Sequence, residues 1–389
     1  MDQKLNVPDK VALAHLQKIC DISNPYADFT SSESDFIQAM IEVTKWHIEH
    51  SEYYKKLAKS QNFSVEEIKS IEDCLKIPHL WAHFFKTREI LSVKTDEVYL
   101  HLTSSGTTGQ KSQIFFDEWT IKSAQRMVDW IFEFYKWITP NSKCNYILFS
   151  YETERSSKLG TAYTDNYLCK YAPVNEVFTA LKLTGEGGHE FDSYGTIDSF
   201  IKFARAGLPV RIFGFPAFLF FALQRMKKLG ITPLKFHPDS LVFLGGGWKG
   251  HADKQIDKTE LYQLAHEMLG IPDSRLRDGF GSVEHCIPYV ECSNHEFHIP
   301  IYSRVFIRDV ETLKPLGFNE KGFLHFVSPY ITSMPAHSVI MGDMASLHKG
   351  SECNCGLNTP FFRVHGRAGL SKNKSCALAA SELLKDKKI

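Results

Sequence analysis

The stretch that decides the fold follows a short expected strand, 97–102, and is rich in hydroxyl side chains and glycine: Thr103-Ser104-Ser105-Gly106-Thr107-Thr108-Gly109-Gln110-Lys111-Ser112. Glycines let a backbone approach a ligand closely, and the N–H and hydroxyl groups of such a loop can surround phosphate oxygens. The loop is not a Walker A loop, because Gln110 stands where that motif has glycine before lysine. A polar surface turn is the simpler alternative, but the composition favours a phosphate-binding loop.

Beyond this loop, strand and helix patterns alternate. The sequence predicts strands over 146–151, 210–213 and 241–244, and helices over 216–230 and 258–269. The third strand runs into Gly245-Gly246-Gly247. Alternation of this kind is typical of an α/β fold with a mostly parallel sheet.

The two ends of the chain differ from this middle region. Apolar residues at helical spacing predict helices over 35–59 and 64–75, the second opening with a capping box at Ser64. Short strands over 304–309, 322–328 and 338–348 predict an antiparallel β subdomain. We therefore expect four segments: a helical N-terminal segment 1–95, an α/β core 96–295, a β-rich subdomain 296–366 and a tail 367–389 that ends in a helix over 375–385.

Composition excludes several classes of protein. The chain has 389 residues, 43% of them apolar, and equal numbers of basic and acidic side chains, 45 of each. A net charge of zero gives no general attraction to nucleic acid or to an anionic membrane. No apolar secretory signal is visible at the N-terminus and no apolar run is long enough to span a bilayer, so we expect a cytoplasmic protein with nine reduced or metal-bound cysteines.

The loop and four later segments follow the order found in adenylate-forming enzymes, which include acyl-CoA ligases and luciferases. Ser-Ser-Gly-Thr-Thr-Gly resembles the phosphate-loop signature of that superfamily. The later segments that resemble its motifs are Gly245-Gly246-Gly247, Phe280-Gly281-Ser282-Val283-Glu284, Gly342-Asp343 and Gly366-Arg367. Each match alone is weak, because Gly-Asp pairs and glycine turns are common, but five matches in the expected order are specific.

The resemblance implies a fold and a set of roles. The fold would be the large α/β domain of adenylate-forming enzymes, with a β subdomain. The phosphate loop, Gly245–Gly247 and Phe280-Gly281 would bind ATP, with Phe280 stacked on adenine. Asp343 would bind the ribose hydroxyls beside Arg367, and Glu284 would hold Mg²⁺. These are the groups that ATP requires: a phosphate loop, a carboxylate for the metal ion, an aromatic face and a carboxylate for the diol.

Three features depart from the superfamily pattern. Val283 stands in place of a threonine, and Gly369 stands where a hinge aspartate is usual. Only 22 residues follow Arg367, so the resemblance implies that the mobile C-terminal lid, with its lysine, is absent. We hypothesise that Lys111, Lys372 or Lys374 supplies the missing positive charge during adenylation.

The tail narrows the resemblance. His365-Gly366-Arg367-Ala368-Gly369, followed by Ser371-Lys372-Asn373-Lys374-Ser375-Cys376-Ala377, resembles the acyl-protein synthetases, the LuxE family. In that family an acyl group passes from AMP to a cysteine near the C-terminus and then to a reductase partner. The resemblance implies that Cys376 is the acyl acceptor, that the substrate is a fatty acid or another carboxylic acid, and that a reductase-type protein takes the product.

Cys376 also has local chemistry that suits a nucleophile. Ser375 is a natural N-cap, which places Cys376 in the first turn of the expected helix, where the helix dipole favours an anion. Lys372 and Lys374 add positive charge, and thiolate is the reactive form of cysteine. A structural cysteine that packs the tail helix is the alternative.

A second cysteine group has the composition of a zinc site. Cys292 and His298, with Cys353 and Cys355 further on, can supply four tetrahedral ligands, and His295 or Cys286 could replace one of them. Ordinary reduced cysteines in a β subdomain are the alternative. The expected cofactors are therefore ATP, Mg²⁺ and a structural Zn²⁺.

The expected reaction is activation of an acid by ATP, followed by loading of Cys376. Two other functions remain open: a phenylacetate-type acyl-CoA ligase, in which Cys376 has no role, and a non-catalytic protein that binds acyl chains or adenylates beside a reductase. The aromatic run at 213–221 is expected to form core, with one or two rings beside an acyl chain.

Overall fold

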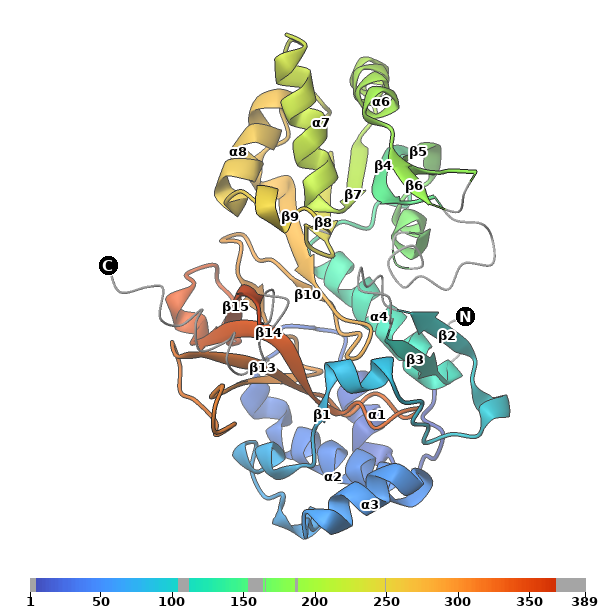
Figure 1. Cartoon of the computed structure of the whole chain (residues 1–389), viewed down its shortest axis with the longest axis vertical. Helices are drawn as coiled ribbons and strands as arrows, with labels where there is room; N and C mark the ends of the chain where they lie inside the picture. The colour runs from blue at the N-terminus through green and yellow to red at the C-terminus, as the bar shows by residue number, and fades with distance from the viewer. Residues whose placement is uncertain are drawn as a thin grey trace. The chain divides into compact units, whose positions relative to one another are not determined.

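The computed structural model describes residues 5–103, 112–152, 164, 166–185, 188–248 and 250–368 (Figure 1). These residues form two compact units. One contains the described residues up to 134 together with 282–368, and the other contains the described residues between 135 and 281. We call them the antiparallel unit and the parallel unit after their sheets. The first unit joins two segments that are distant in sequence, and the four-segment division stays a prediction.

Within the parallel unit, the strands of the sheet lie in the order β9-β8-β7-β4-β5-β6. All neighbours in this order are parallel except β5 and β6. The strands are β4 (Cys144–Tyr151), β5 (Val174–Leu183), β6 (His189–Phe191), β7 (Val210–Gly214), β8 (Leu241–Gly245) and β9 (Leu276–Phe280). The predicted parallel sheet is thus confirmed, and β4 and β7 are buried along nearly their whole length, as strands covered on both faces must be.

The helices of this unit have the end signals that the sequence suggested. Helix α7 (Pro216–Lys228) begins with proline at its first position, and α8 (Lys258–Leu269) begins after Asp257, whose carboxylate accepts from the N–H of Thr259, and ends at left-handed Gly270. Helix α6 (Ser193–Ala206) packs beside α7, as Figure 1 shows. Apolar faces of these helices and the sheet share one core that includes Ile212, Phe215, Leu219 and Leu244.

The antiparallel unit has a sheet in the order β11-β15-β14-β13-β12, with β1 pairing parallel to β14. The other neighbours are antiparallel. Its strands are β1 (Leu80–Trp81), β11 (Phe297–His298), β12 (Arg304–Arg308), β13 (Lys321–Val327), β14 (Ser338–His348) and β15 (Phe361–Arg367), with β10 (Tyr289–Val290) nearby in sequence. The three strands predicted here are confirmed, because each observed end lies within two residues of the predicted end. The long strand β14 pairs with β1, β13 and β15.

The rest of this unit is helical or forms a small hairpin. Strands β2 (Leu100–Thr103) and β3 (Gln113–Phe116) pair antiparallel. The helices are α1 (Ala14–Cys20), α2 (Glu33–His50), α3 (Glu52–Ser60) and α4 (Glu118–Phe134). Helices α2 and α3 confirm the predicted helical stretch, with a break at Ser51, whose backbone is extended. Helix α4 was not expected from the sequence.

The helix predicted over 64–75 is wrong. The structure has two short 3₁₀ turns there, Val65–Glu67 and Glu72–Lys76, separated by extended Ile68. The capping box at Ser64 and Glu67 is present, but Ile68 is buried, and the Asp73 carboxylate accepts from the N–H groups of Lys69 and Ser70. A side chain that takes these N–H groups competes with helix continuation. The helix expected over 375–385 lies outside the described residues.

Among the described residues, none of the helices combines the length and the apolarity needed to cross a membrane.

Several imidazoles are buried in the antiparallel unit. His47 stacks on His337 with ring centroids 4.6 Å apart, and His337 Nε2 lies 3.2 Å from the Tyr54 hydroxyl. His325 Nδ1 accepts from Arg308 Nε at 3.1 Å, so this ring is neutral and its Nε2–H faces Ser338 Oγ at 2.9 Å. Burial lowers the pKa of His47 and His325 well below the ordinary value and that of His337 to about 3.

We expect the antiparallel unit to lose stability as the pH falls below about 6.5. The unfolded chain binds protons at these histidines near their ordinary pKa, whereas the folded chain does not. The free energy of unfolding should therefore fall by up to about 1.4 kcal/mol per pH unit for each neutral histidine, and become pH-independent above their ordinary pKa. Urea unfolding measured across this range should show a shallower slope for His337→Phe; a slope equal to that of the wild type would contradict the assignment.

Candidate adenylation site and metal cluster

The glycine and aromatic motifs of the parallel unit meet at one edge of its sheet. Gly245 ends β8 and is the register partner of Gly279 on β9, and Phe280 ends β9. Gly246 and Gly247 follow with φ of 75° and 69°, a backbone conformation that side chains other than glycine rarely adopt. Carboxyl ends of parallel strands are where open α/β sheets bind ligands. The structure thus brings the predicted adenine-binding residues together, and their role stays a prediction.

The predicted phosphate loop begins and ends on a strand pair. Thr103 at the end of β2 is the register partner of Gln113 at the start of β3. The residues between them that we expect to contact phosphate, Ser104, Ser105, Gly106, Thr107, Thr108, Gly109 and Lys111, lie outside the described residues. The described strands show that the chain leaves β2 and returns antiparallel on β3, so the loop is the connection of a hairpin.

Three predicted residues meet in the antiparallel unit. Asp343 on β14 and Arg367 on β15 are register partners, and Arg367 Nε lies 3.7 Å from Asp343 Oδ1. Burial raises the pKa of Asp343, Arg367 lowers it and the negative charge of Glu284 raises it further. Glu284 is 7% exposed and has no hydrogen-bond or ion-pair partner among the described residues. A buried carboxylate and a partly buried one with so few donors form an arrangement that suits a cation or a hydroxyl-rich ligand.

The segment that carries Glu284 is a tight turn held against β14. The N–H of Cys286 donates to the Ser282 carbonyl at 2.7 Å, and Ser282 Oγ lies 3.9 Å from Met341 Sδ. Met341 precedes Gly342 and Asp343, so the turn is fixed beside the Gly-Asp pair. Val283, which stands in place of the superfamily threonine, lies on this turn.

The strand pair also fixes where the tail begins. The N–H of Ala368 donates to the Gly342 carbonyl at 2.8 Å, immediately beside Asp343. Gly369 and all later residues, including Lys372, Lys374 and Cys376, lie outside the described residues. The chain that leads to Cys376 therefore departs next to the predicted ribose carboxylate.

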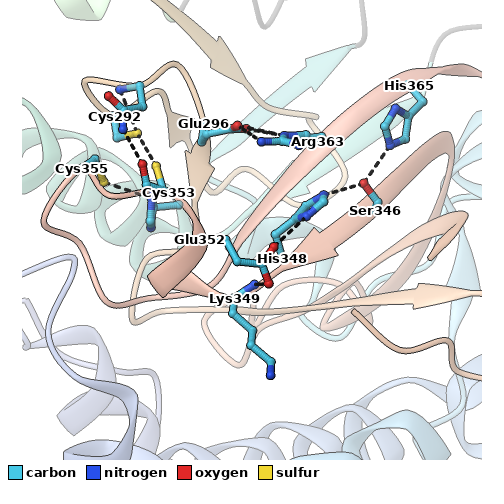
Figure 2. Close-up of polar contacts among 12 residues, drawn as sticks. Cys292, Glu296, Ser346, His348, Lys349, Glu352, Cys353, Cys355, Arg363 and His365 are labelled. Carbon is cyan, nitrogen blue, oxygen red and sulfur yellow. Dashed lines mark hydrogen bonds and ion pairs between the residues drawn. The ribbon is translucent and has the colours of Figure 1, made fainter. Parts of the chain in front are cut away.

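Four of the predicted metal ligands converge in the antiparallel unit (Figure 2). The ligand atoms of Cys292, His298, Cys353 and Cys355 all lie within 4.8 Å of one another. Cys292 Sγ is 3.5 Å from Cys353 Sγ, and Cys355 Sγ is 3.2 Å from His298 Nε2. Tetrahedral zinc with bonds of about 2.0–2.3 Å places neighbouring ligand atoms about 3.5–3.8 Å apart. The separations of these two pairs are close to that requirement.

Neighbouring hydrogen-bonding groups and burial make these side chains suitable ligands for a cation. His298 Nδ1 lies 2.7 Å from the Thr359 carbonyl, so Nδ1 carries the proton and Nε2 presents a lone pair toward Cys355. The N–H of Asn294 donates to Cys292 Sγ at 3.3 Å. Burial raises the pKa of Cys292 and Cys353. Thiolates at these positions therefore need a positive charge beside them.

The two alternative ligands point elsewhere. Cys286 Sγ contacts the Val283 carbonyl at 3.2 Å, and His295 Nδ1 lies 3.2 Å from Glu291 Oε2. Neither belongs to the cluster, although Cys286 and His295 lie close to it in sequence. Asn354, between Cys353 and Cys355, has φ of 58°, which bends the chain so that both sulfurs reach the same point.

A polar network that the sequence did not indicate runs along the same strand pair (Figure 2). Ser346 Oγ lies 2.8 Å from both His348 Nε2 and His365 Nε2. Near the start of β15, the end closer to the cysteine–histidine cluster, Arg363 forms an ion pair with Glu296. These contacts join residues of two strands up to 67 positions apart in sequence, and no short spacing in the sequence signals them.

The aromatic run at 213–221 is core, as its composition indicated. Phe213, Phe215, Phe218 and Phe220 are buried. Phe221 is only partly buried and packs edge-on against His251 at 5.0 Å.

Comparisons with known proteins agree with this geometry. The sequence profile of a family described as acyl-protein synthetase, LuxE, matches residues 9–385. Two curated relatives named long-chain-fatty-acid–luciferin-component ligase are 25% identical (Vibrio harveyi) and 23% identical (Aliivibrio fischeri). Each alignment covers 87% of this chain, and 85% and 86% of the respective relative.

Solved structures show the fold. An open conformation of 2-hydroxyisobutyryl-CoA ligase in complex with 2-HIB-AMP and CoA superimposes with a TM-score of 0.66 at 12% identity, covering 97% of this chain and 83% of that chain. The same ligase in the postadenylation state gives 0.65 at 12% identity, covering 94% and 73%. The predicted adenylate-forming fold is confirmed by this likeness. Because the family profile spans nearly the whole sequence, the chain belongs to the acyl-protein synthetase, LuxE, family.

Proposed function

We propose that this protein activates a long-chain fatty acid with ATP and then carries the acyl group on Cys376. A carboxylate oxygen of the acid attacks the α-phosphorus of ATP, pyrophosphate leaves, and acyl-AMP forms. The thiolate of Cys376 then attacks the acyl carbon, AMP leaves, and a thioester remains on the protein. The acid is proposed from the curated relatives, whose names specify long-chain fatty acids.

The observation that carries the proposal is the pair of carboxylates, buried Glu284 and partly buried Asp343, in the region of Arg367. Asp343 would accept hydrogen bonds from the ribose diol, as charge-assisted bonds of this kind are strong. Glu284, which has no partner among the described residues, would hold Mg²⁺ through its carboxylate oxygens. Mg²⁺ would neutralise phosphate charge while the acid attacks. Both carboxylates lie in the antiparallel unit.

Removal of the ribose carboxylate tests the nucleotide assignment. We expect Asp343→Ala to weaken ATP binding and to lower fatty-acid-dependent ATP–pyrophosphate exchange by about 100-fold or more, because two charge-assisted hydrogen bonds of about 1.5–3 kcal/mol each would be lost. Asp309→Ala is a matched control, since Asp309 is an exposed carboxylate that bonds only to its own turn. Exchange at the wild-type rate in Asp343→Ala would show that the Gly-Asp pair was misassigned.

The position of the tail supports Cys376 as the first acceptor. Cys376 follows Ala368 by eight residues, and Ala368 is bonded to Gly342 beside Asp343. Eight extended residues span at most about 29 Å, so Cys376 is tethered close to the predicted ribose site. A short tether raises the effective concentration of the thiol at the adenylate. We propose that the acyl group is then delivered to a reductase-type partner.

Intact-protein mass spectrometry tests the acceptor. Wild type incubated with ATP, Mg²⁺ and a fatty acid should gain one acyl group on a peptide containing Cys376, in a form cleaved by neutral hydroxylamine. Cys376→Ser should retain pyrophosphate exchange, because no proposed ATP ligand has changed, but lose this label. Acylation of another cysteine in Cys376→Ser would overturn the self-acylation step, and an acyl-CoA product with no labelled protein would favour the CoA-ligase alternative.

We further propose that Cys292, His298, Cys353 and Cys355 bind one structural Zn²⁺. The support is the convergence of their ligand atoms within 4.8 Å of one another, the Thr359 carbonyl that orients His298, and the burial of two of the thiols. A metal ion here would tie the turn after β14 to the start of β11, and would stabilise both loops.

Metal analysis of the purified, reduced protein should give about one zinc per chain. Cys355→Ser should lose the metal and lower the melting temperature. Cys286→Ser is the matched control, because its sulfur contacts the Val283 carbonyl rather than the cluster, and it should keep the metal. Absence of zinc from wild type purified without chelators, or its loss from Cys286→Ser alone, would contradict this ligand set.

A further inference from the structure

The strand that carries Arg367 contains one extra residue. Along β14 and β15, Ala345 pairs with Val364 and Met344 pairs with Gly366, so His365 has no opposite residue. This is a β-bulge, and Gly366 within it has φ of 128°, a conformation that favours glycine. β-Bulges commonly re-aim side chains beside active sites.

The bulge determines where the last residues of β15 lie. After it, Arg367 is opposite Asp343 and the N–H of Ala368 reaches the Gly342 carbonyl. Without the bulge, the pairing of β15 with β14 would shift by one position for every residue after Val364. A shift of one residue turns every following side chain to the other face of a sheet, so Arg367 would leave Asp343.

A hydrogen bond links the extra residue to β14. Ser346 Oγ, on β14, contacts Nε2 of both His365 and His348 at 2.8 Å (Figure 2). A hydroxyl has one proton, so it can donate to only one imidazole and must accept from the other. His348 Nδ1 lies 3.6 Å from Glu352 Oε2, which favours a proton on Nδ1 and leaves its Nε2 as the acceptor.

The direction of the chain of hydrogen bonds follows. Ser346 donates to His348, and His365 Nε2–H donates to Ser346. Ser346 is buried and has its orientation fixed by His348, whereas His365 is exposed. The buried Ser346 hydroxyl is therefore held in one orientation, and the side chain of the bulged residue is hydrogen-bonded to it.

We propose that Ser346 and His365 are positioning residues for adenylation: their hydrogen bond holds the bulge and thereby keeps Arg367 opposite Asp343 at the nucleotide. This inference rests on the proposed nucleotide role of Asp343. The bond between Ser346 Oγ and His365 Nε2 links β14 to the bulge, so both residues act through the backbone of β15.

A matched control lies on the same strand. Ser338, also on β14 and also buried, makes the same kind of bond to His325 Nε2 at 2.9 Å. Ser338 pairs with Val327 of β13 and has no contact with β15 in the register. Ser338→Ala therefore removes an equivalent serine–histidine bond from the same sheet without touching the bulge.

The experiment compares Ser346→Ala, His365→Ala and the double variant with Ser338→Ala in the full-length protein. For each, the KM for ATP and kcat are measured by fatty-acid-dependent pyrophosphate exchange, together with the melting temperature.

We expect both single variants to raise the KM for ATP about five-fold, the typical effect of one hydrogen bond, with little change in kcat. The double variant should be no worse than the larger single effect, because one bond is shared. Ser338→Ala should lower the melting temperature without changing the KM.

His365→Gln provides the rescue. Its amide can donate to Ser346 as the imidazole does, so its KM should be nearer to that of wild type than to that of His365→Ala. Because His365 is exposed, this pair decides the question even if Ser346→Ala does not fold. A KM in His365→Ala equal to wild type, or an equal rise in Ser338→Ala, would overturn the proposal. Loss of exchange in Asp343→Ala alongside an unchanged His365→Ala would reject only this inference, whereas wild-type exchange in Asp343→Ala would reject the proposed nucleotide site.

Discussion

The pairing of β14 with β15 is the constraint on which the antiparallel unit depends. β14 contacts β13 on one side and β15 on the other, and β1 also pairs with it. The same strand pair carries Asp343 opposite Arg367 near one end and His348 opposite Phe361 near the other. Phe361 in turn is the register partner of His298 on β11. Candidate nucleotide residues and the metal cluster are therefore arranged by one continuous set of backbone hydrogen bonds.

Several polar groups in this unit are linked into hydrogen-bonded chains. Arg308, His325 and Ser338 form one such chain, and His365, Ser346 and His348 form another. Buried polar groups cost free energy unless they find partners, and networks that satisfy each member specify a single arrangement. Glu284 differs, because it is buried without such a partner among the described residues. A buried carboxylate without a partner in the protein is a group that a cation can bind.

Much of the fold could be predicted from local signals, and the failures have physical causes. Helix α8 was predicted at its observed bounds, and in the structure an N-cap aspartate and a C-terminal glycine enclose it. The helix over 64–75 was wrong because Asp73 takes N–H groups that a helix would need. Helix α4 was missed, although its apolar residues at helical spacing, such as Met127 and Ile131, are buried. Propensity and capping are local, whereas the burial that decides such cases depends on distant segments.

The candidate site shows the same division between local and distant information. Cys353 and Cys355 could be predicted as a pair from their spacing, but choosing His298 over His295 required the fold, because Glu291 holds His295 away. The bulge at His365 could not be predicted at all, since an extra residue is defined only by its partner strand, and Ser346 is 19 residues away in sequence. A sequence motif such as Gly366-Arg367 therefore identifies which residues are used, while the register of β14 and β15 determines what they face. It follows that a homologous chain could keep Asp343 and Arg367 and still lose their alignment by a single insertion in β15.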